Sequence, residues 1–464
     1  MIAKYISTAG QVADIVEGQL IGEYNLPIEF IVSDSREIKD GNNLFVALKG
    51  ENFNGHDFIP ELIKSGKTTA VLSSQNDFDE LPSKYKVAVI KCKDTLKALA
   101  ILAANHRDSV FTEIIGVTGT NGKTTVKELL YSVISASHSC HKSEKNFNNE
   151  IGVPFTLFGL EPEHEFAVIE MGMNHAGEIK RLSQAVKPDI AVITSIGEGH
   201  IEFLKTVENI ALAKSEIFMG MEDCTIAFVN RDCPYFNLIC EQADKYGVLV
   251  KSYGLSKNAE YFPKSYSVSD KGIVIEMFKS KVNVPLYGLH NVYNVVGVMA
   301  ICEYIGISIN DIKKGFASFE NISGRNEILY RGYTIINDTY NSNPSSVKSA
   351  LKSMCVAFPD KSKTVIISDM LELGDCAESL HFEVGKFIAE CNVDALFVFG
   401  NFAEHLRKGA VAGGMNPEII FSTADREKFI GSIKDYKTTL SNNDVVLVKG
   451  SRSTKMEEVV EVLG

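Results

Sequence analysis

A glycine-rich loop between a strand-like and a helix-like segment constrains the fold of this chain more than any other feature. The loop, GVTGTNGKTT, occupies residues 116–125; an apolar stretch at 112–117 leads into it, and an amphipathic stretch at 126–134 follows. Glycines let backbone N–H groups turn toward phosphate oxygens, and the N-terminus of a following helix adds positive dipole. Lys123 would then reach the terminal phosphates, and the Thr124 hydroxyl would ligate Mg²⁺. The pattern predicts a P-loop that binds a nucleoside triphosphate.

The spacing in this loop departs from the common pattern, which has four residues between its first glycine and the Gly-Lys pair. Five residues lie between Gly116 and Gly122, so Val117 stands where the first glycine is usual. The alternative is a glycine-rich turn without a ligand. Three glycines, two threonines and the correct flanking segments favour the phosphate-binding interpretation.

The length and the net charge of the chain indicate how many domains it forms and which partners are not expected. At roughly 150 residues per domain, a chain of 464 residues is expected to form three domains. The net charge is −12 and the basic residues are scattered, so no nucleic-acid partner is expected.

Cysteine usage and hydropathy predict a soluble, cytoplasmic protein. The nine cysteines include no Cys-x-x-Cys pair, which suits reduced thiols better than a disulfide framework or a zinc site. The N-terminal stretch soon meets Asp14 and Glu17, so no signal peptide is expected. No apolar run approaches the roughly 18 residues needed to span a bilayer, which argues against integral membrane association.

Alternating strand-like and helix-like segments divide the chain into three expected α/β domains, at residues 1–110, 111–323 and 324–464. This alternation is typical of mainly parallel, doubly wound sheets in the second and third domains. The expected strands are 28–33, 43–48, 70–73 and 86–90 in the first domain, 112–117, 166–169 and 189–194 in the second, and 333–336, 363–367, 395–399 and 445–448 in the third.

Polar side chains follow the strands of the second domain. Glu170 ends the strand at 166–169, and His200 lies just after the strand at 189–194. Because ligands bind beyond the carboxyl ends of parallel strands, we expect Lys123, Glu170 and His200 at one edge of the sheet. Taken alone, a strand-end glutamate such as Glu170 is solvated at least half the time, and a histidine such as His200 is more often structural than a ligand. Their convergence with a P-loop favours a functional site.

Other candidates remain open on pattern alone. Lys214 lies on an amphipathic helix at 207–219, where a solvated charge is the plainer interpretation. Asn294 is expected in the first turn of an apolar helix, as an adenine contact or a helix cap. The turn formed by Ser33, Asp34, Ser35 and Arg36 suits a polyanionic ligand, although such turns are more often solvated. Polar clusters at 337–344, 368–374 and 449–452 follow strands of the third domain, where a second substrate would bind.

Over essentially its whole length, the chain resembles the Mur ligase family of ATP-dependent amide-bond-forming enzymes. The motifs that carry the resemblance are Gly119-Thr-Asn-Gly-Lys-Thr-Thr125, Asp34-Ser-Arg36, Leu44-Phe-Val-Ala-Leu48, Gly55-His-Asp57, Asn148-Asn-Glu-Ile-Gly-Val-Pro154 and Asp338-Thr-Tyr-Asn-Ser-Asn-Pro344. The resemblance accounts for the spacing of the P-loop. It implies an α/β fold of three domains: a small UDP-sugar-binding domain, a central P-loop domain with a doubly wound, mainly parallel sheet, and a C-terminal Rossmann-like domain.

The last motif is the most telling for the branch of the family that adds D-alanyl-D-alanine to UDP-N-acetylmuramoyl-tripeptide. Family resemblance implies ATP, two magnesium ions, an acyl-phosphate intermediate and a role in peptidoglycan synthesis, in a chain expected to be a monomer. The branch that adds the third amino acid is the nearest alternative, but its Asp-Asn-Pro-Arg-type motif is absent from the third domain. Folylpolyglutamate synthetase shares only the last two domains. A nucleotide-dependent switch protein is a further alternative, although a guanine-reading Asn-Lys-x-Asp motif is absent.

The resemblance also implies roles for particular residues. ATP contacts fall on Gly119, Thr120, Asn121, Gly122, Lys123, Thr124, Thr125, Asn294, Arg325 and Asp338. Magnesium ligands are Thr124, Glu170, His200 and Lys214, the last as a carbamate on its amine; Lys123, His200 and Lys214 are the expected catalytic residues. Substrate contacts are Ser33, Asp34, Ser35 and Arg36 for the UDP-sugar, with Asn148 and Asn149, and Asn341, Asn343 and Asp369 toward the dipeptide.

Overall fold

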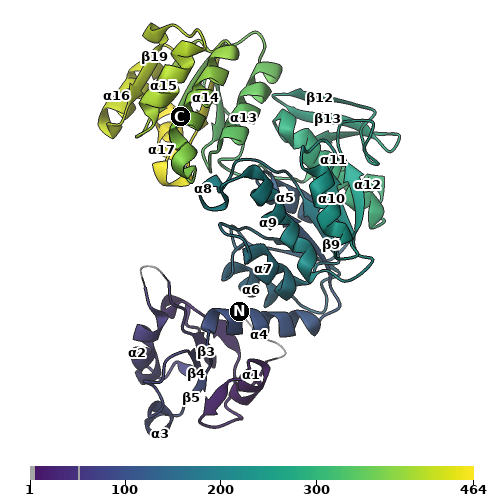
Figure 1. Cartoon of the computed structure of the whole chain (residues 1–464), viewed down its shortest axis with the longest axis vertical. Coiled ribbons are helices and arrows are strands. Elements are labelled where there is room, and N and C mark those ends of the chain that lie inside the picture. Colours follow the sequence, from purple (N-terminus) through teal and green to yellow (C-terminus); the bar gives the residue numbers. More distant parts are fainter. Residues whose placement is uncertain (1–5, 51–52) are drawn as a thin grey trace.

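The computed structural model describes residues 6–50 and 53–464, which form three α/β units in series along the long axis of the molecule (Figure 1). Residues 1–5 of the expected first domain, with Glu51 and Asn52, lie outside the described residues. The purple first unit and the green-to-yellow third unit lie at opposite ends, with the teal central unit between them. The expected α/β class is confirmed.

The first unit is a sheet with strand order β1-β5-β4-β3-β2, in which only the β1–β5 pair is antiparallel. Helix α4 connects it to the central unit by packing on α6 and α7. Asp94 caps α4, because its side chain accepts hydrogen bonds from the N–H groups of Leu96 and Lys97. The elements are α1 (Ala9–Ile15), β1 (Gln19–Ile21), β2 (Phe30–Val32), β3 (Asn43–Val46), α2 (Ile59–Lys64), β4 (Thr68–Ser73), α3 (Leu81–Lys84), β5 (Ala88–Lys91) and α4 (Thr95–Asp108).

The central unit is built on a parallel sheet with strand order β11-β10-β9-β6-β8-β7. Successive residues of β6 face opposite sides: Ile114 packs in the cluster that contains α7 and α9, while Ile115 and Val117 pack with α5 and α11. The sheet is therefore doubly wound, as expected. Its elements are β6 (Glu113–Thr118), α5 (Lys123–Ile134), β7 (Cys140–Lys142), α6 (Gly152–Leu157), β8 (Phe166–Glu170), α7 (Glu178–Val186), β9 (Ile190–Ile193), α8 (Ile201–Leu204), α9 (Val207–Ser215), β10 (Ile226–Asn230), α10 (Phe236–Asp244), β11 (Leu249–Tyr253), α11 (Leu289–Tyr304) and α12 (Ile309–Ala317).

A small antiparallel sheet, β12-β13-β14, was not predicted from the sequence. Its strands are β12 (Ser265–Ser269), β13 (Gly272–Met277) and β14 (Ser280–Val284). Ile273, Ile275 and Val282 on its inner face join the same hydrophobic cluster as α5 and α11. The sheet thus extends the core on the face of the central unit that carries the P-loop helix.

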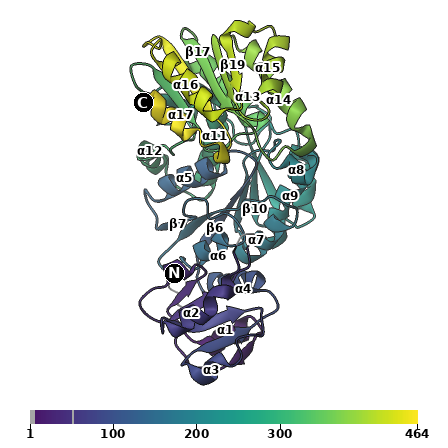
Figure 2. The ribbon, with the colours of Figure 1, turned by 90° about the vertical axis from the view of Figure 1, so that its left-hand side faces the viewer.

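The third unit has the strand order β15-β16-β20-β17-β18-β19, with only β15–β16 antiparallel. Helices α13, α14 and α15 pack on one face, and α16 and α17 on the other (Figure 2). Its elements are β15 (Glu327–Tyr330), β16 (Thr334–Asp338), α13 (Pro344–Ala357), β17 (Ser362–Ser368), α14 (Ala377–Glu390), β18 (Ala395–Phe399), α15 (Ala403–Ala412), β19 (Ile420–Thr423), α16 (Arg426–Lys437), β20 (Asp444–Lys449) and α17 (Glu457–Leu463).

One local expectation about α11 is wrong. The helix begins at Leu289, so Asn294 is its sixth residue and lies in the second turn rather than the first. Asn294 therefore does not cap the helix. Its side chain donates instead to Asn291 Oδ1 at 2.7 Å, and the Asn291 amide donates to the Tyr287 carbonyl at 2.6 Å.

Candidate active site between the central and third units

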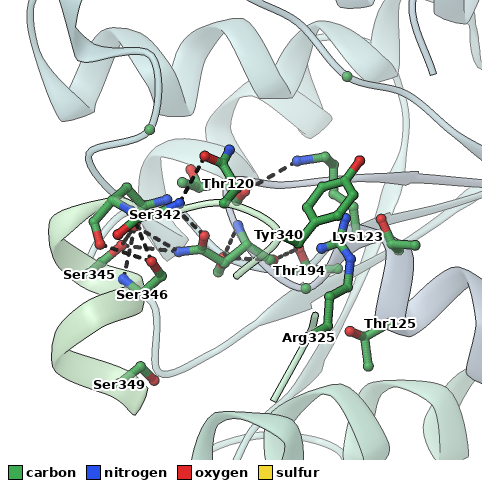
Figure 3. A pocket seen from close by; sticks show the side chains of 18 of the residues that line it. Thr120, Lys123, Thr125, Thr194, Arg325, Tyr340, Ser342, Ser345, Ser346 and Ser349 are labelled. Carbon is green, nitrogen blue, oxygen red and sulfur yellow. Dashed lines mark hydrogen bonds between the residues drawn. The ribbon is translucent and has the colours of Figure 1, made fainter. Parts of the chain in front are cut away.

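A cavity of about 740 Å³ lies between the central and third units, at the carboxyl ends of their strands (Figure 3). Parallel-sheet topology explains its position, because the polar residues that follow each strand gather at that edge. The residues singled out from the sequence that line it are Thr120, Asn121, Gly122, Lys123, Thr124, Thr125, Asn148, Glu170, His200, Asn294, Arg325, Asp338, Asn341 and Asn343.

The P-loop needs its glycines for conformation and for space. Gly119 has φ 148° and Gly122 has φ 86°, a region that favours glycine. A Cβ atom on Gly119 would lie 2.0 Å from Thr194 Oγ1. Gly119 itself does not line the cavity but lets the loop pass close to the strand behind it. Helix α5 then begins at Lys123, so its N-terminus faces the cavity.

Lys123 folds back onto its own loop. Its Nζ atom donates to the carbonyls of Gly119 at 2.9 Å and Thr120 at 3.2 Å. Burial lowers the pKa of Lys123; the nearby Glu170 carboxylate opposes that change, and the Arg325 charge adds to it. An anion that enters the cavity would interact favourably with both of these cations.

Glu170 presents one free carboxylate oxygen. The side chain ends β8 and is only 2% exposed. Its Oε1 atom accepts from Asn148 Nδ2 at 2.8 Å, and its backbone N–H donates to Ser143 Oγ at 3.0 Å. Its Oε2 atom is buried without a hydrogen-bond partner among the described residues. A buried, unsatisfied carboxylate oxygen beside a P-loop fits a position for a cation.

Lys214 lies in the last turn of α9 and is fully buried. Its Nζ atom has no hydrogen-bond partner within residues 6–50 and 53–464. Burial, and secondly the charge of Lys123, hold the pKa of Lys214 well below its ordinary value. The plain interpretation of Lys214 as a solvated surface charge is therefore wrong, because this side chain is a buried amine without a partner.

His200 connects the central unit to the third. It has a left-handed backbone, with φ 64°, and precedes α8. Its Nδ1 atom lies 2.6 Å from Glu372 Oε2, and this contact lowers the pKa of Glu372. The Glu202 N–H donates to the Glu372 carbonyl at 3.1 Å. His200 therefore reaches the cavity and also holds the loop that follows β17.

A second connection joins the P-loop directly to helix α13. Asn121 Nδ2 donates to Ser345 Oγ at 3.0 Å, and Asn343 Nδ2 donates to Asn121 Oδ1 at 2.9 Å. Asn343 also caps α13 by accepting from the Ser346 N–H at 2.9 Å. The Asn343 side chain, which is expected to bind substrate, therefore caps α13 and also contacts the P-loop.

The third unit contributes a buried ion pair that the site prediction did not include. Lys449, at the end of β20, is 2% exposed; its Nζ atom lies 2.5 Å from Asp338 Oδ2 and donates to the Asn341 carbonyl at 2.9 Å. Asn326 Nδ2 donates to Asp338 Oδ1 at 3.2 Å. Burial lowers the pKa of the neighbouring His290 to about 4, with Asp338 opposing the change. The position of Lys449 at a strand end was the available signal, since 449–452 had been noted as a polar cluster.

Two expected substrate contacts have other roles in the structure. Asp369 is 5% exposed and does not line the cavity; its carboxylate accepts from the backbone N–H groups of Asn401 at 2.7 Å and Phe402 at 3.0 Å. Asn149 Oδ1 accepts from the N–H groups of Ile151 and Gly152 and so starts α6. Local backbone groups engage both side chains, and their roles as substrate contacts stay predictions.

The turn at Ser33–Arg36 lies in the first unit and does not line this cavity. Asp34 accepts from the Arg36 backbone N–H at 2.9 Å and pairs with its guanidinium at 2.6 Å, which lowers the pKa of Asp34 to about 2. The Arg36 side chain is 87% exposed. The pair is open to solvent and accessible to a ligand of the first unit.

The described residues contain no group of three His, Cys, Asp or Glu side chains placed to hold a metal ion. A Mg²⁺ ion bound by one or two protein oxygens and by substrate phosphates does not require such a group. Of the helices in the described part of the chain, none has the length and apolar character needed to cross a membrane.

Comparison with known proteins places these features in one family. Three family profiles match: "Mur ligase family, catalytic domain" at residues 27–107, "Mur ligase middle domain" at 117–302, and "Mur ligase, glutamate ligase domain" at 324–452. The UDP-N-acetylmuramoyl-tripeptide–D-alanyl-D-alanine ligase of Bacillus subtilis (strain 168) is 34% identical over 462 residues, which cover 98% of each chain. The enzyme of the same name from Escherichia coli (strain K12) is 31% identical over 468 residues, again covering 98% of each chain.

Solved structures are similar over the same length. A crystal structure of MurF from Acinetobacter baumannii superposes with a TM-score of 0.89 at 28% identity and covers 98% of each chain. MurF ligase from Thermotoga maritima in complex with ADP has a TM-score of 0.81 at 27% identity and covers 93% of this chain and 96% of that one. Folylpolyglutamate synthase from Mycobacterium tuberculosis, at 17% identity and a TM-score of 0.64, shares the fold over 79% of this chain.

Proposed function

This chain belongs to the Mur ligase family, and we propose that it is an ATP-dependent ligase that joins D-alanyl-D-alanine to a UDP-N-acetylmuramoyl-tripeptide. The product would be the UDP-N-acetylmuramoyl-pentapeptide, a peptidoglycan precursor. One observation carries the proposal: the P-loop of the central unit and the polar strand ends of the third unit line one cavity. The full-length relatives from Bacillus subtilis and Escherichia coli support this substrate pair.

The reaction must first activate a carboxylate, which is a poor electrophile. Transfer of the γ-phosphoryl group of ATP to the terminal carboxylate of the tripeptide gives an acyl phosphate and ADP. The amine of D-alanyl-D-alanine then attacks the acyl carbon; the tetrahedral intermediate expels phosphate, and the nitrogen loses a proton. Lys123 and Arg325 line the cavity and would offset the negative charge that crowds the transferring phosphoryl group.

We assign each unit one ligand. Residues 1–110 would bind the UDP-sugar, with Ser33, Asp34, Ser35 and Arg36 as contacts, and the exposed Arg36 guanidinium supports this role. Residues 111–323 would bind ATP, with Asn294 near the adenine. Residues 324–464 would bind the incoming dipeptide beside Asn341. We propose that the chain acts as a monomer in the cytoplasm, and the nucleotide substrates support the cytoplasmic location.

Magnesium fits the residues at the P-loop. Thr124 and Glu170 line the cavity and offer a hydroxyl and a carboxylate, and the unpartnered Oε2 atom of Glu170 supports a cation there. His200 would be the third protein ligand, although imidazole is an unusual choice for Mg²⁺ and its Nδ1 atom is engaged by Glu372. Bound Mg²⁺ would neutralise phosphate charge during transfer.

Lys214 would complete that set as a carbamate. A neutral, unpartnered amine can add to CO₂ and lose a proton, which replaces a cation by a carboxylate. The buried Nζ atom and its lowered pKa support this chemistry. Incubation with ¹³C-bicarbonate should give a carbamate signal in ¹³C NMR spectra of the protein that Lys214→Ala abolishes. Lys214→Ala should also lose nearly all turnover, with partial rescue by short carboxylic acids; full activity would remove Lys214 from the site.

The decisive experiment measures phosphate release from ATP and Mg²⁺ with UDP-N-acetylmuramoyl-tripeptide, with and without D-alanyl-D-alanine. Release that requires both substrates, together with a product of pentapeptide mass, is expected. Release with the corresponding dipeptide and a diamino acid instead would indicate the branch that adds the third residue. Release that requires neither would indicate a nucleotide-dependent switch.

A further inference from the structure

The Arg325 side chain is held by an aromatic ring. The Arg325 Cζ atom lies 3.8 Å from the centre of the Tyr340 ring, and both side chains line the cavity (Figure 3). The Arg325 Nε atom is buried, and in the part of the chain that the structure describes it has no hydrogen-bond partner. A guanidinium stacked on an aromatic face is attracted by the ring and keeps its N–H donors free in the plane.

The backbone around Arg325 is fastened to the third unit on both sides. The Tyr340 N–H donates to the Gly324 carbonyl at 3.0 Å. Asn326, with φ 55°, donates from Nδ2 to Asp338 Oδ1 at 3.2 Å. Glu327 then begins β15, which pairs with β16. Arg325 is therefore fastened to the third unit just after the expected boundary at 323/324, and a longer contact of 3.4 Å joins Asn326 Nδ2 to His290 Nε2 of the central unit.

Among the described residues, the contact of the Arg325 guanidinium with the Tyr340 ring is its stabilising interaction inside the cavity, and its Nε atom has no hydrogen-bond acceptor. Lys123 lies close enough for the two charges to interact, and Glu170 is the carboxylate that acts on Lys123. Figure 3 shows the Arg325 side chain beside the Tyr340 ring, with Lys123 in the same part of the cavity. Two neighbouring cations at a P-loop, of which Arg325 has an unpartnered Nε–H among the described residues, are arranged to bind phosphate oxygens.

We propose that Tyr340 is a positioning residue: its ring orients the Arg325 guanidinium so that the third unit carries this arginine onto the terminal phosphate of the nucleotide. The inference rests on the proposed function, since it takes ATP as the ligand of the cavity. The ring performs this role, because the Arg325 guanidinium lies over its face. Tyr340 thus acts through Arg325 and needs no contact with the substrate.

The test compares Tyr340→Phe, Tyr340→Leu, Arg325→Ala and the double variant in the full-length enzyme. Tyr340→Phe keeps the ring and should leave kcat within about twofold, whereas Tyr340→Leu should lower kcat about tenfold with KM for ATP changed less than about threefold. Arg325→Ala should lower kcat by about 1,000-fold, within the range for arginines that contact a transferring phosphoryl group. Tyr304→Leu, an exposed tyrosine outside the cavity, is the matched control and should leave kcat unchanged.

The double variant separates positioning from direct contact. If Tyr340 acts through Arg325, Tyr340→Leu should lower kcat no further in the Arg325→Ala background. A further tenfold loss there would mean that Tyr340 acts by itself and would overturn the inference. Wild-type kcat in Tyr340→Leu would overturn it as well.

A binding measurement keeps this inference distinct from the proposed function. Calorimetric titration with ADP and with a non-hydrolysable ATP analogue reports the contact to the terminal phosphate without ligation. Tyr340→Leu and Arg325→Ala should both weaken binding of the analogue about fivefold more than binding of ADP. If the wild-type enzyme fails to ligate D-alanyl-D-alanine but this selectivity changes as expected, the proposed function falls and the inference stands. Equal effects on both nucleotides would refute the inference.

Discussion

Lys127→Met tests how the loop before Glu170 is held. Lys127 lies on α5, with its side chain 1% exposed. Its Nζ atom donates to the carbonyls of Ser143 at 2.8 Å and Lys145 at 3.3 Å, and pairs with Glu128 Oε1 at 2.9 Å. The segment that it holds carries Ser143 Oγ, which accepts from the Glu170 N–H, and leads to Asn148. The buried lysine therefore supports the carboxylate assigned to Mg²⁺.

The magnitude follows from these bonds. Hydrogen bonds to a charged group contribute about 1.5–3 kcal/mol each, and the methionine would leave two carbonyls without their donor. Methionine retains most of the volume and avoids burial of a charge, which offsets part of the loss. We expect the loop to be destabilised by about 3 kcal/mol, equivalent to roughly a 100-fold change in its opening equilibrium.

Hydrogen exchange measured by mass spectrometry reports the stability of this loop separately from that of the rest of the protein. The amides of residues 143–149 should exchange up to about 100-fold faster in Lys127→Met, while the sheet of the third unit is unaffected. The Mg²⁺ concentration for half-maximal turnover should rise about tenfold, because the backbone and one oxygen of Glu170 lose their support. Circular dichroism reports global folding, since the chain has no tryptophan.

Lys142→Met is the matched control. Lys142 pairs with the same carboxylate, Glu128, at 2.5 Å, but its side chain is 23% exposed and holds no loop carbonyl in the described residues. A partly exposed pair of this kind contributes about 1 kcal/mol or less. If Lys127→Met and Lys142→Met gave the same exchange rates and the same Mg²⁺ dependence, the reasoning from burial would be refuted.

Three further changes test the cavity. Lys449→Met leaves the buried Asp338 carboxylate without its cation and should lower the free energy of unfolding by about 3 kcal/mol. The melting temperature measured by circular dichroism should then fall by roughly 6–12 °C, and a fall of less than about 2 °C would contradict this expectation. Because burial lowers the pKa of His290 from 6.5 to about 4, the unfolded chain binds more protons between these values, and stability falls by about 2 kcal/mol as the pH drops from 7 to 5. His290→Asn should reduce the difference in melting temperature between pH 7 and pH 5 accordingly, and an unchanged difference would refute this assignment. Asn121→Ala removes the side-chain contacts of the P-loop with Asn343, so the nucleotide-free protein should show a larger radius of gyration in solution scattering, whereas an identical curve would count against this connection.

Periodicity and parallel-sheet topology predicted the fold and the convergence of the site. The segment at 112–117 is observed as Glu113–Thr118, and the strand expected at 445–448 as Asp444–Lys449. Lys123, Glu170 and His200 line one cavity because their strands are parallel and end at the same edge. These features depend on local pattern and on one topological rule, which is why sequence alone was sufficient. The chemical roles of these residues stay predictions.

The partners of individual side chains could not be predicted in the same way. Lys449 meets Asp338 across 111 positions of the chain, and no local pattern encodes that pair. Asp369 lies at a strand end as Glu170 does, but its carboxylate accepts a hydrogen bond from the Asn401 N–H in the turn at Gly400. The turn packs so closely on this carboxylate that a Cβ atom on Gly400 would lie 2.3 Å from Asp369 Oδ1. A strand-end position therefore predicts that a polar residue is near the site, but the competition among backbone donors decides which side chain remains free.

The charges in the cavity argue that phosphate strengthens the contact between the central and third units. The central unit supplies Lys123, and the third unit adds Arg325 on a backbone fastened to its own sheet. Lys449, in contrast, forms an ion pair with Asp338 within the third unit, so the pair adds no net positive charge to the cavity. Approach of Arg325 to Lys123 is repulsive in an empty cavity and becomes attractive once a polyphosphate lies between them. Nucleotide binding should therefore draw the third unit closer to the P-loop and bring the strand ends to which we assign the dipeptide toward the tripeptide carboxylate.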